Sequence, residues 1–257
     1  MSRLHLALAA ASLCSISVYA LAAVPAYVTA AIADKHRPET ETSRDVNRRP
    51  GELIEFAGIK PGMKVVDLLP GIGPAAYFTR IFSGVVGPKG TVYAYYGTQY
   101  DERLKTRMNL DPENQGAQFA ADYPNVKALH SHLEQFKTPE PVDLVWTSNN
   151  YHDMKNKAYA MDTAKVNAAI FASLKPGGIY LIMDHKAPKG AGLAVTETLH
   201  RMDADVLKQE VEAAGFKLIA ESDVVANPED DVTKRVFEQG EHDHTAEIVM
   251  KFQKPLR

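Results

Sequence analysis

Short apolar runs alternate with longer amphipathic stretches along most of the chain. Seven of these runs predict strands, and the first five are rich in β-branched and aromatic residues, which is typical of buried strands. They lie at residues 64–69, 91–96, 125–130, 142–148, 178–184, 217–225 and 245–254. Apolar residues that recur every three or four positions predict helices at 50–58, 75–87, 158–178 and 202–216. Strands and helices in this order predict a doubly wound α/β sheet, because parallel neighbours need crossover helices.

The last two predicted strands differ from the others because only a polar loop, residues 227–243, separates them. A pair joined without a crossover helix can be antiparallel. The chain is therefore expected to form a seven-stranded, mostly parallel sheet whose last strand runs antiparallel to the rest.

The N-terminal segment has the layout of a secretory signal peptide: Arg3, then an apolar run, then small residues around Ala22. An uncleaved anchor is the alternative, since the run approaches membrane-spanning length. It is disfavoured because four arginines follow the run and one precedes it. We expect a signal peptide at 1–23, a polar arm at 24–50 and one domain at 51–257. The mature protein is then periplasmic or secreted, without stable membrane insertion.

Composition narrows the possible functions. The 257 residues are 45% hydrophobic and 24% charged, which is ordinary for a globular protein, and the net charge of -3 gives no reason to expect a nucleic-acid partner. Cys14 is the only cysteine, so the chain has no disulfide framework, zinc ribbon or cysteine-ligated cluster. The chemistry of the protein does not depend on thiols.

A glycine-rich loop follows the first predicted strand and leads into a helix. It begins at Asp67 and contains Gly71, Gly73 and Ala76 in the spacing G-x-G-x-x-A. Glycines there let the backbone approach a ligand, and the helix N-terminus can bind an anionic group. The spacing alone fits a dinucleotide as well as other nucleosides.

The chain resembles the class I S-adenosylmethionine (SAM)-dependent methyltransferases over about residues 52–255. The resemblance rests on segments in the order and spacing of that fold: 61–73 (PGMKVVDLLPGIG), 87–96 (GPKGTVYAYY), 142–154 (VDLVWTSNNYHDM), 174–185 (LKPGGIYLIMDH) and 211–219 (VEAAGFKLI). Within the family it looks most like a group of predicted exported bacterial methyltransferases. Their RDxNRxP-like arm corresponds to residues 44–50 and their NYHD segment to residues 150–153.

The resemblance implies a cofactor site. Asp67, Gly71 and Gly73 would hold the amino-acid end of SAM, and Asn149 would lie beside it. Two positions depart from the family pattern. Tyr96 stands where an acid usually binds the ribose hydroxyls, and His132 stands where an Asp often lies near the adenine amine. A phenol cannot bridge two hydroxyls as a carboxylate does, so packing roles for both residues remain open.

Candidate acid–base groups follow the fourth and fifth predicted strands. His152 is a candidate general base with Asp153 as its orienter, and Asp184 with His185 is a second candidate pair, because the carboxyl ends of strands face the ligand in open α/β sheets. The alternative is that His152 packs against the next helix while Asp153 caps it. No metal is expected, since the histidines lack a metal-binding spacing.

These features predict a SAM-dependent methyltransferase with a small-molecule acceptor. The alternative is a methyltransferase-like fold with an altered or lost cofactor site that serves as an exported binding protein. A nicotinamide oxidoreductase is disfavoured, because residues 95–98 offer no acid for the adenosine ribose. Residues 44–50 could form a lid over the ligand or a solvated linker.

Overall fold

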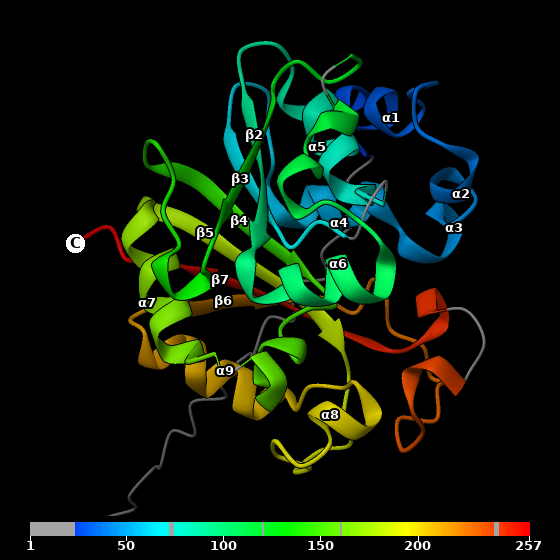
Figure 1. Cartoon of the computed structure of the whole chain (residues 1–257), viewed down its shortest axis with the longest axis vertical. Coiled ribbons are helices and arrows are strands. Elements are labelled where there is room, and N and C mark those ends of the chain that lie inside the picture. Colours follow the sequence, from blue (N-terminus) through cyan, green and yellow to red (C-terminus); the bar gives the residue numbers. More distant parts are fainter. Residues whose placement is uncertain (1–23, 72–74, 120, 160, 239–241) are drawn as a thin grey trace, which may run out of the picture.

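Seven strands form one mixed sheet through the molecule (Figure 1). The computed structural model describes residues 24–71, 75–119, 121–159, 161–238 and 242–257. The strands are β1 Lys64–Leu68, β2 Thr91–Gly97, β3 Val126–Ser131, β4 Val142–Ser148, β5 Leu174–His185, β6 Lys217–Glu221 and β7 Glu247–Gln253. Their order in the sheet is β3-β2-β1-β4-β5-β7-β6. β7 runs antiparallel to β5 and β6, and the other adjacent pairs are parallel, as predicted.

Helices cover both faces of the sheet (Figure 1). The α-helices are α1 Ala26–Ile32, α2 Glu39–Thr42, α3 Asp45–Arg48, α4 Pro50–Ala57, α5 Tyr77–Val86, α6 Asp101–Met108, α7 Thr163–Ser173, α8 Thr196–Leu199 and α9 Ala204–Ala213. Short 3-10 segments lie at Thr98–Tyr100, Pro112–Asn114, Ala117–Phe119, Leu133–Gln135, Asp153–Lys155, Lys157–Tyr159, Val236–Glu238 and His242–His244.

The hydrophobic core consists of two layers, one on each face of the sheet, and β1 contributes side chains alternately to both. Val65 packs with α1, α4 and α5 on one face, whereas Val66 packs with α7 and α9 on the other. Successive side chains of a strand point to opposite faces of the sheet. Because helices cover both faces, a parallel strand of this sheet has apolar side chains on each face. Trp146 of β4 fills the first layer, with its ring 4.6 Å from Phe78 of α5.

The sequence pattern located all seven strands but erred at some boundaries. The predicted helix at 158–178 begins only at Thr163, where the Asp162 side chain accepts hydrogen bonds from the amides of Ala164 and Lys165. It ends at Ser173, because Leu174 already pairs with Val142 in the sheet. The prediction of burial is wrong for β3, an edge strand whose side chains are half-buried or exposed.

The predicted leader and part of the glycine-rich loop lie outside the described residues. Residues 1–23 and 72–74, with Gly73, belong to that remainder. Within the part that the structure describes, no helix is both long and apolar enough to cross a membrane.

Candidate functional site

An open pocket lies at the carboxyl ends of β1, β2 and β4. Its cavity volume is about 110 Å³. The described residues that line it are Leu69, Gly71, Tyr96, Gly97, Tyr100, Arg103, Leu104, Gln115, Asn150 and Asp153. The strand order reverses between β1 and β4, and open α/β sheets bind ligands at such a switch point.

Tight turns after β1 and β4 shape one wall of this pocket. Leu69 and Asn149 both have positive φ, 58° and 57°, which side-chain-bearing residues adopt rarely. Gly71 has φ 135°, and a Cβ there would collide with the carbonyl oxygen of Ala75. The Asn150 amide donates to the carbonyl oxygens of Leu69, at 3.0 Å, and Ser148, at 2.6 Å, and so joins the ends of the two strands.

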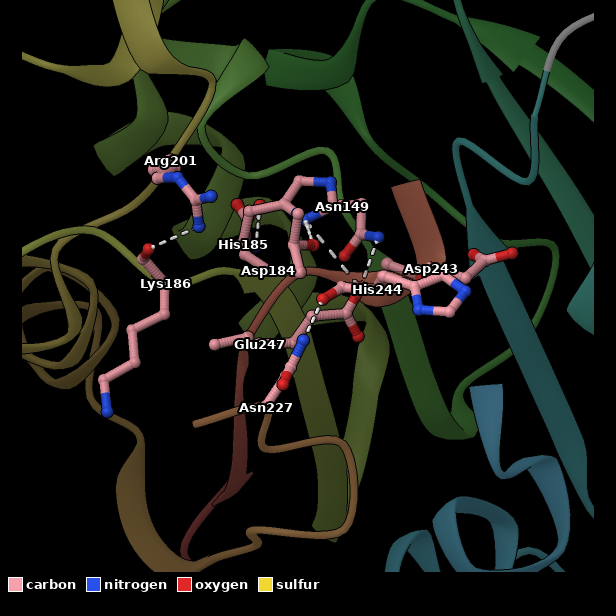
Figure 2. A network of polar contacts seen from close by, with 12 residues as sticks. Asn149, Asp184, His185, Lys186, Arg201, Asn227, Asp243, His244 and Glu247 are labelled. Carbon is pink, nitrogen blue, oxygen red and sulfur yellow. Dashed lines mark hydrogen bonds and ion pairs between the residues drawn. The ribbon is translucent and has the colours of Figure 1, made fainter. Parts of the chain in front are cut away.

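Asn149 does not line the pocket, although its neighbour Asn150 does. The Asn149 side chain instead donates to Glu247 Oε1 at 2.7 Å, at the start of β7 (Figure 2). Burial raises the pKa of Glu247 to about 7, with Asn149 and Arg48 acting in the opposite direction. The two adjacent asparagines therefore have different roles: Asn149 binds Glu247, and Asn150 lines the pocket.

Asp67 is buried against α5 instead of facing the pocket. Its Oδ2 accepts a hydrogen bond from the Thr79 hydroxyl at 2.6 Å. Burial raises the pKa of Asp67 to about 7, and the Thr79 bond and the charge of Arg48 only partly offset it. Asp67 is not among the described lining residues, so in this geometry it fixes the helix that follows the glycine-rich loop.

The two positions that depart from the family pattern have different surroundings. Tyr96 lines the pocket, and its hydroxyl donates to the Gln115 carbonyl at 3.4 Å, a long hydrogen bond. His132 is not among the described lining residues; its Nδ1 lies 3.2 Å from Gln99 Nε2. The same Gln99 accepts the Leu133 amide at 3.2 Å. His132 thus supports the turn after β3 through Gln99.

Tyr100 is one of the pocket residues that the sequence did not indicate. Its hydroxyl is buried and has no hydrogen-bond partner among the described residues, while its side chain lines the pocket. Burial raises the pKa of Tyr100 well above its ordinary value, with Asp153 adding to the effect. A buried polar atom without a partner is costly, so a ligand group that reached this hydroxyl would gain a hydrogen bond without breaking one within the described residues.

A buried histidine–aspartate pair lies beside the pocket. His152 Nδ1 is 2.6 Å from Asp184 Oδ1, and Asp184 Oδ2 accepts the His152 amide at 2.7 Å. Burial lowers the pKa of His152, but the charges of Asp184 and Asp153 outweigh it and hold that pKa above its ordinary value. The orienter of His152 is therefore Asp184, not Asp153 as predicted, because the ends of β4 and β5 are adjacent.

His185 belongs to the same network but faces away from Asp184. Its Nδ1 lies 2.6 Å from the Thr245 hydroxyl, and its backbone amide donates to Asp184 Oδ1 at 2.8 Å. Figure 2 shows Asp184 and His185 near Asn149 and Glu247. The two predicted acid–base pairs are consequently one connected group in which Asp184 holds His152.

His200 joins this group from the end of α8. A donor atom of each of His152, Asp153 and His200 lies within 4.8 Å of the others. The fold thus brings together two histidines and an aspartate whose spacing in the sequence does not indicate a common site. Sequence spacing could not show it, because His200 is distant in the chain from the other two.

The N-terminal arm is bound to the C-terminal part of the chain. Arg44 Nη2 and Arg48 Nη1 donate to Asp243 at 2.8 and 2.9 Å, and Arg48 Nη2 donates to the Ser148 hydroxyl at 3.1 Å. Burial opposes ionisation of Asp243, yet the two arginines hold its pKa below the ordinary value. Arg48 also stacks on Tyr77, with its guanidinium carbon 4.6 Å from the ring centroid. These contacts argue against a solvated linker.

Comparisons with known proteins identify the class of fold. The structure matches a SAM-dependent methyltransferase from Aquifex aeolicus (TM-score 0.54, 18% identity, 84% of this chain and 95% of that one). It also matches an arsenic(III) S-adenosylmethionine methyltransferase from Chlamydomonas reinhardtii (TM-score 0.51, 17% identity, 91% of this chain and 74% of that one). The chain therefore has the class I SAM-dependent methyltransferase fold.

Sequence relatives point to the same class. The ubiquinone/menaquinone biosynthesis C-methyltransferase UbiE of Shewanella pealeana is 28% identical over 193 residues, covering 72% of this chain and 68% of that protein. The UbiE of Shewanella piezotolerans is 32% identical over 141 residues, covering 53% of this chain and about half, 48%, of that protein. No protein-family model matches the chain.

Proposed function

We propose that the protein is a SAM-dependent methyltransferase that acts on a small-molecule acceptor. The observation that carries the proposal is the pocket at the switch point of the sheet, with the unpartnered hydroxyl of Tyr100 in its wall. The fold and the UbiE relatives support the same cofactor. When bound, SAM supplies an electrophilic methyl group, so the chain itself needs mainly to bind, orient and exclude water.

The residues of the pocket fit such a cofactor. Gly71 gives the close backbone approach that a bulky ligand requires, since a side chain there would collide with the neighbouring loop. Tyr100 offers a buried hydroxyl, and Gln115 and Asn150 offer polar groups within a largely apolar wall. Tyr96, rather than an acid, then faces the ribose, and its hydroxyl makes a long hydrogen bond to the Gln115 carbonyl.

The acceptor is expected at the end of the pocket that Asp153 lines. His152 lies next to Asp153, with 3.5 Å between His152 Nε2 and Asp153 Oδ1. Asp184 orients the ring of His152 through its contact with Nδ1, and the His185 amide donates a hydrogen bond that holds Asp184 in place. We therefore assign the contact with the acceptor to His152 and Asp153, and positioning roles to Asp184 and His185.

Calorimetric titration of the purified chain tests the proposal, with SAM, S-adenosylhomocysteine and NAD as ligands. SAM and S-adenosylhomocysteine should each bind once per chain, whereas NAD should not bind, because the fold and the sequence relatives are those of methyltransferases. Absence of heat with both sulfur nucleosides would contradict the proposal and favour an exported binding protein with a lost cofactor site. Binding of NAD alone would indicate an oxidoreductase.

Export is the second part of the proposal. The basic, apolar and small-residue order of the first 23 residues supports cleavage near Ala23 and a periplasmic or secreted mature protein. Expression of the full chain in a bacterium, followed by N-terminal sequencing of the periplasmic fraction, should give a mature protein that begins near residue 24. A cytoplasmic protein with an intact N-terminus would contradict export without affecting the enzymatic proposal.

A further inference from the structure

Three side chains at the end of the pocket have the donor types and spacing of a metal site. They are His152 and Asp153, which follow β4, and His200, which follows α8. Asp153 Oδ1 lies 3.5 Å from His152 Nε2 and 3.6 Å from His200 Nδ1. Donors at about 2.0–2.2 Å around a tetrahedral zinc-like ion lie roughly 3.3–3.6 Å apart. These two distances agree with this geometry, and the donor nitrogens of His152 and His200 lie within 4.8 Å of each other.

Asp184 holds the ring of His152 in an orientation that suits a metal ligand. Asp184 is fully buried and accepts from the Nδ1 side of His152, from the His152 amide and from the His185 amide. This arrangement places the proton on Nδ1 and leaves the lone pair of Nε2 toward Asp153. A carboxylate bound to the far nitrogen of a ligating histidine is the usual outer shell of protein metal sites.

His200 completes the group from the solvent side. Its backbone is left-handed, with φ 54°, and the ring centroids of His200 and His152 are 5.4 Å apart. Phe237 packs on the other side of the His200 ring at 4.8 Å. Arg235 Nη2 is 3.4 Å from His200 Nε2. This contact is long and exposed, so Arg235 can move away when a metal replaces the proton on Nδ1.

We propose that His152 Nε2, Asp153 Oδ1 and His200 Nδ1 bind one divalent transition-metal ion of the zinc class. Two imidazoles with one carboxylate favour such ions over Mg²⁺ and Ca²⁺, which prefer oxygen ligands. Three protein ligands leave a coordination position for a small molecule.

The site deepens the proposed function and rests on it for its role. Because Asp153 lines the pocket as well as the cluster, a ligand of the metal lies at the acceptor end. A metal ion lowers the pKa of a coordinated hydroxyl. The class of acceptor that fits is therefore a hydroxylated small molecule whose oxygen binds the metal.

Titration of the untagged, metal-free chain with Co²⁺ tests the site, because Co²⁺ absorption reports both binding and coordination number. The parent chain should bind one Co²⁺ with the intense visible bands of four- or five-fold coordination, and Zn²⁺ should remove them. His200→Asn should weaken Co²⁺ binding at least tenfold, since Asn tolerates the left-handed backbone but is a poor ligand. Asp184→Asn should weaken it about 10–100-fold by loosening His152.

His36 gives a matched control, since it also lies near two carboxylates, 2.9 Å from Asp34 and 3.8 Å from Asp122, but on the surface. His36→Asn should leave Co²⁺ binding unchanged. Absence of the bands, or equal affinity in the parent chain and in folded His200→Asn, would overturn the site. The titration contains no SAM, so a failure of the proposed function appears separately in the calorimetry.

The role in acceptor binding has its own readout. Catechol, used as a small hydroxylated probe, should shift the Co²⁺ bands of the parent chain by entering the open coordination position. Unchanged bands at saturating catechol would overturn the assignment of a hydroxylated acceptor.

Discussion

Replacing Tyr100 with Phe separates ligand binding from folding more sharply than other changes in the pocket. The Tyr100 hydroxyl is buried without a partner among the described residues, so Tyr100→Phe removes no hydrogen bond from the free chain. Relief from an unpaired buried group should raise the free energy of unfolding by about 1 kcal/mol. If SAM pairs with the hydroxyl, the variant loses about 0.5–1.5 kcal/mol of binding, which weakens SAM roughly 2- to 12-fold.

Tyr180→Phe is the matched control for this experiment. Tyr180 also has a buried hydroxyl without a partner among the described residues, but it lies in β5 and does not line the pocket. Both variants should melt at or above the parent temperature, and only Tyr100→Phe should weaken SAM in calorimetric titration. Equal SAM affinity in the two variants would refute the assignment of Tyr100, and a lower melting temperature for Tyr100→Phe would refute the reasoning about its hydroxyl.

Three further predictions concern the surroundings of the pocket. The pKa of Asp67 is about 7 in the folded chain and about 3.9 unfolded, so the folded state keeps a proton that the unfolded state loses. The free energy of unfolding should fall as pH rises from about 4 to about 7, and urea titrations of Asp67→Asn should show a smaller fall. Arg48→Met should keep apolar packing on Tyr77 but lose the guanidinium stacking and the hydrogen bonds to Asp243 and Ser148. The loss should cost about 1.5–3 kcal/mol in urea unfolding. An unchanged midpoint would contradict the docked arm. Deletion of residues 34–49 should lower both the melting temperature and the SAM affinity, whereas a solvated linker would change neither.

The sequence predicted most of the sheet because its strands have strong local signals. β1 and β4 are short runs rich in valine and other apolar residues, and the end of β5 is marked by Asp184 and His185. The α6 helix was not predicted, because it is charged nearly all round and buries only Leu104. The pattern of apolar positions therefore gave no sign of the element that follows Tyr100 and lines the pocket with it.

The sequence predicted the parts of the candidate site that depend on neighbouring residues, but not the contacts between residues that are distant in the chain. The turn after β4 was located correctly, but the sequence did not show which of two adjacent asparagines lines the pocket. The partner of His152 was assigned to its neighbour Asp153, whereas strand order places Asp184 closer. The approach of His200 depends on the path of the chain after β5, which periodicity does not encode.

A crystal structure of the chain with S-adenosylhomocysteine tests the central claim most directly. The nucleoside should occupy the pocket between Gly71, Gly97 and Asn150, with one of its polar atoms within hydrogen-bond distance of the Tyr100 hydroxyl. Density for the ligand at another place on the chain, or an unchanged Tyr100 without a contact to it, would contradict the account.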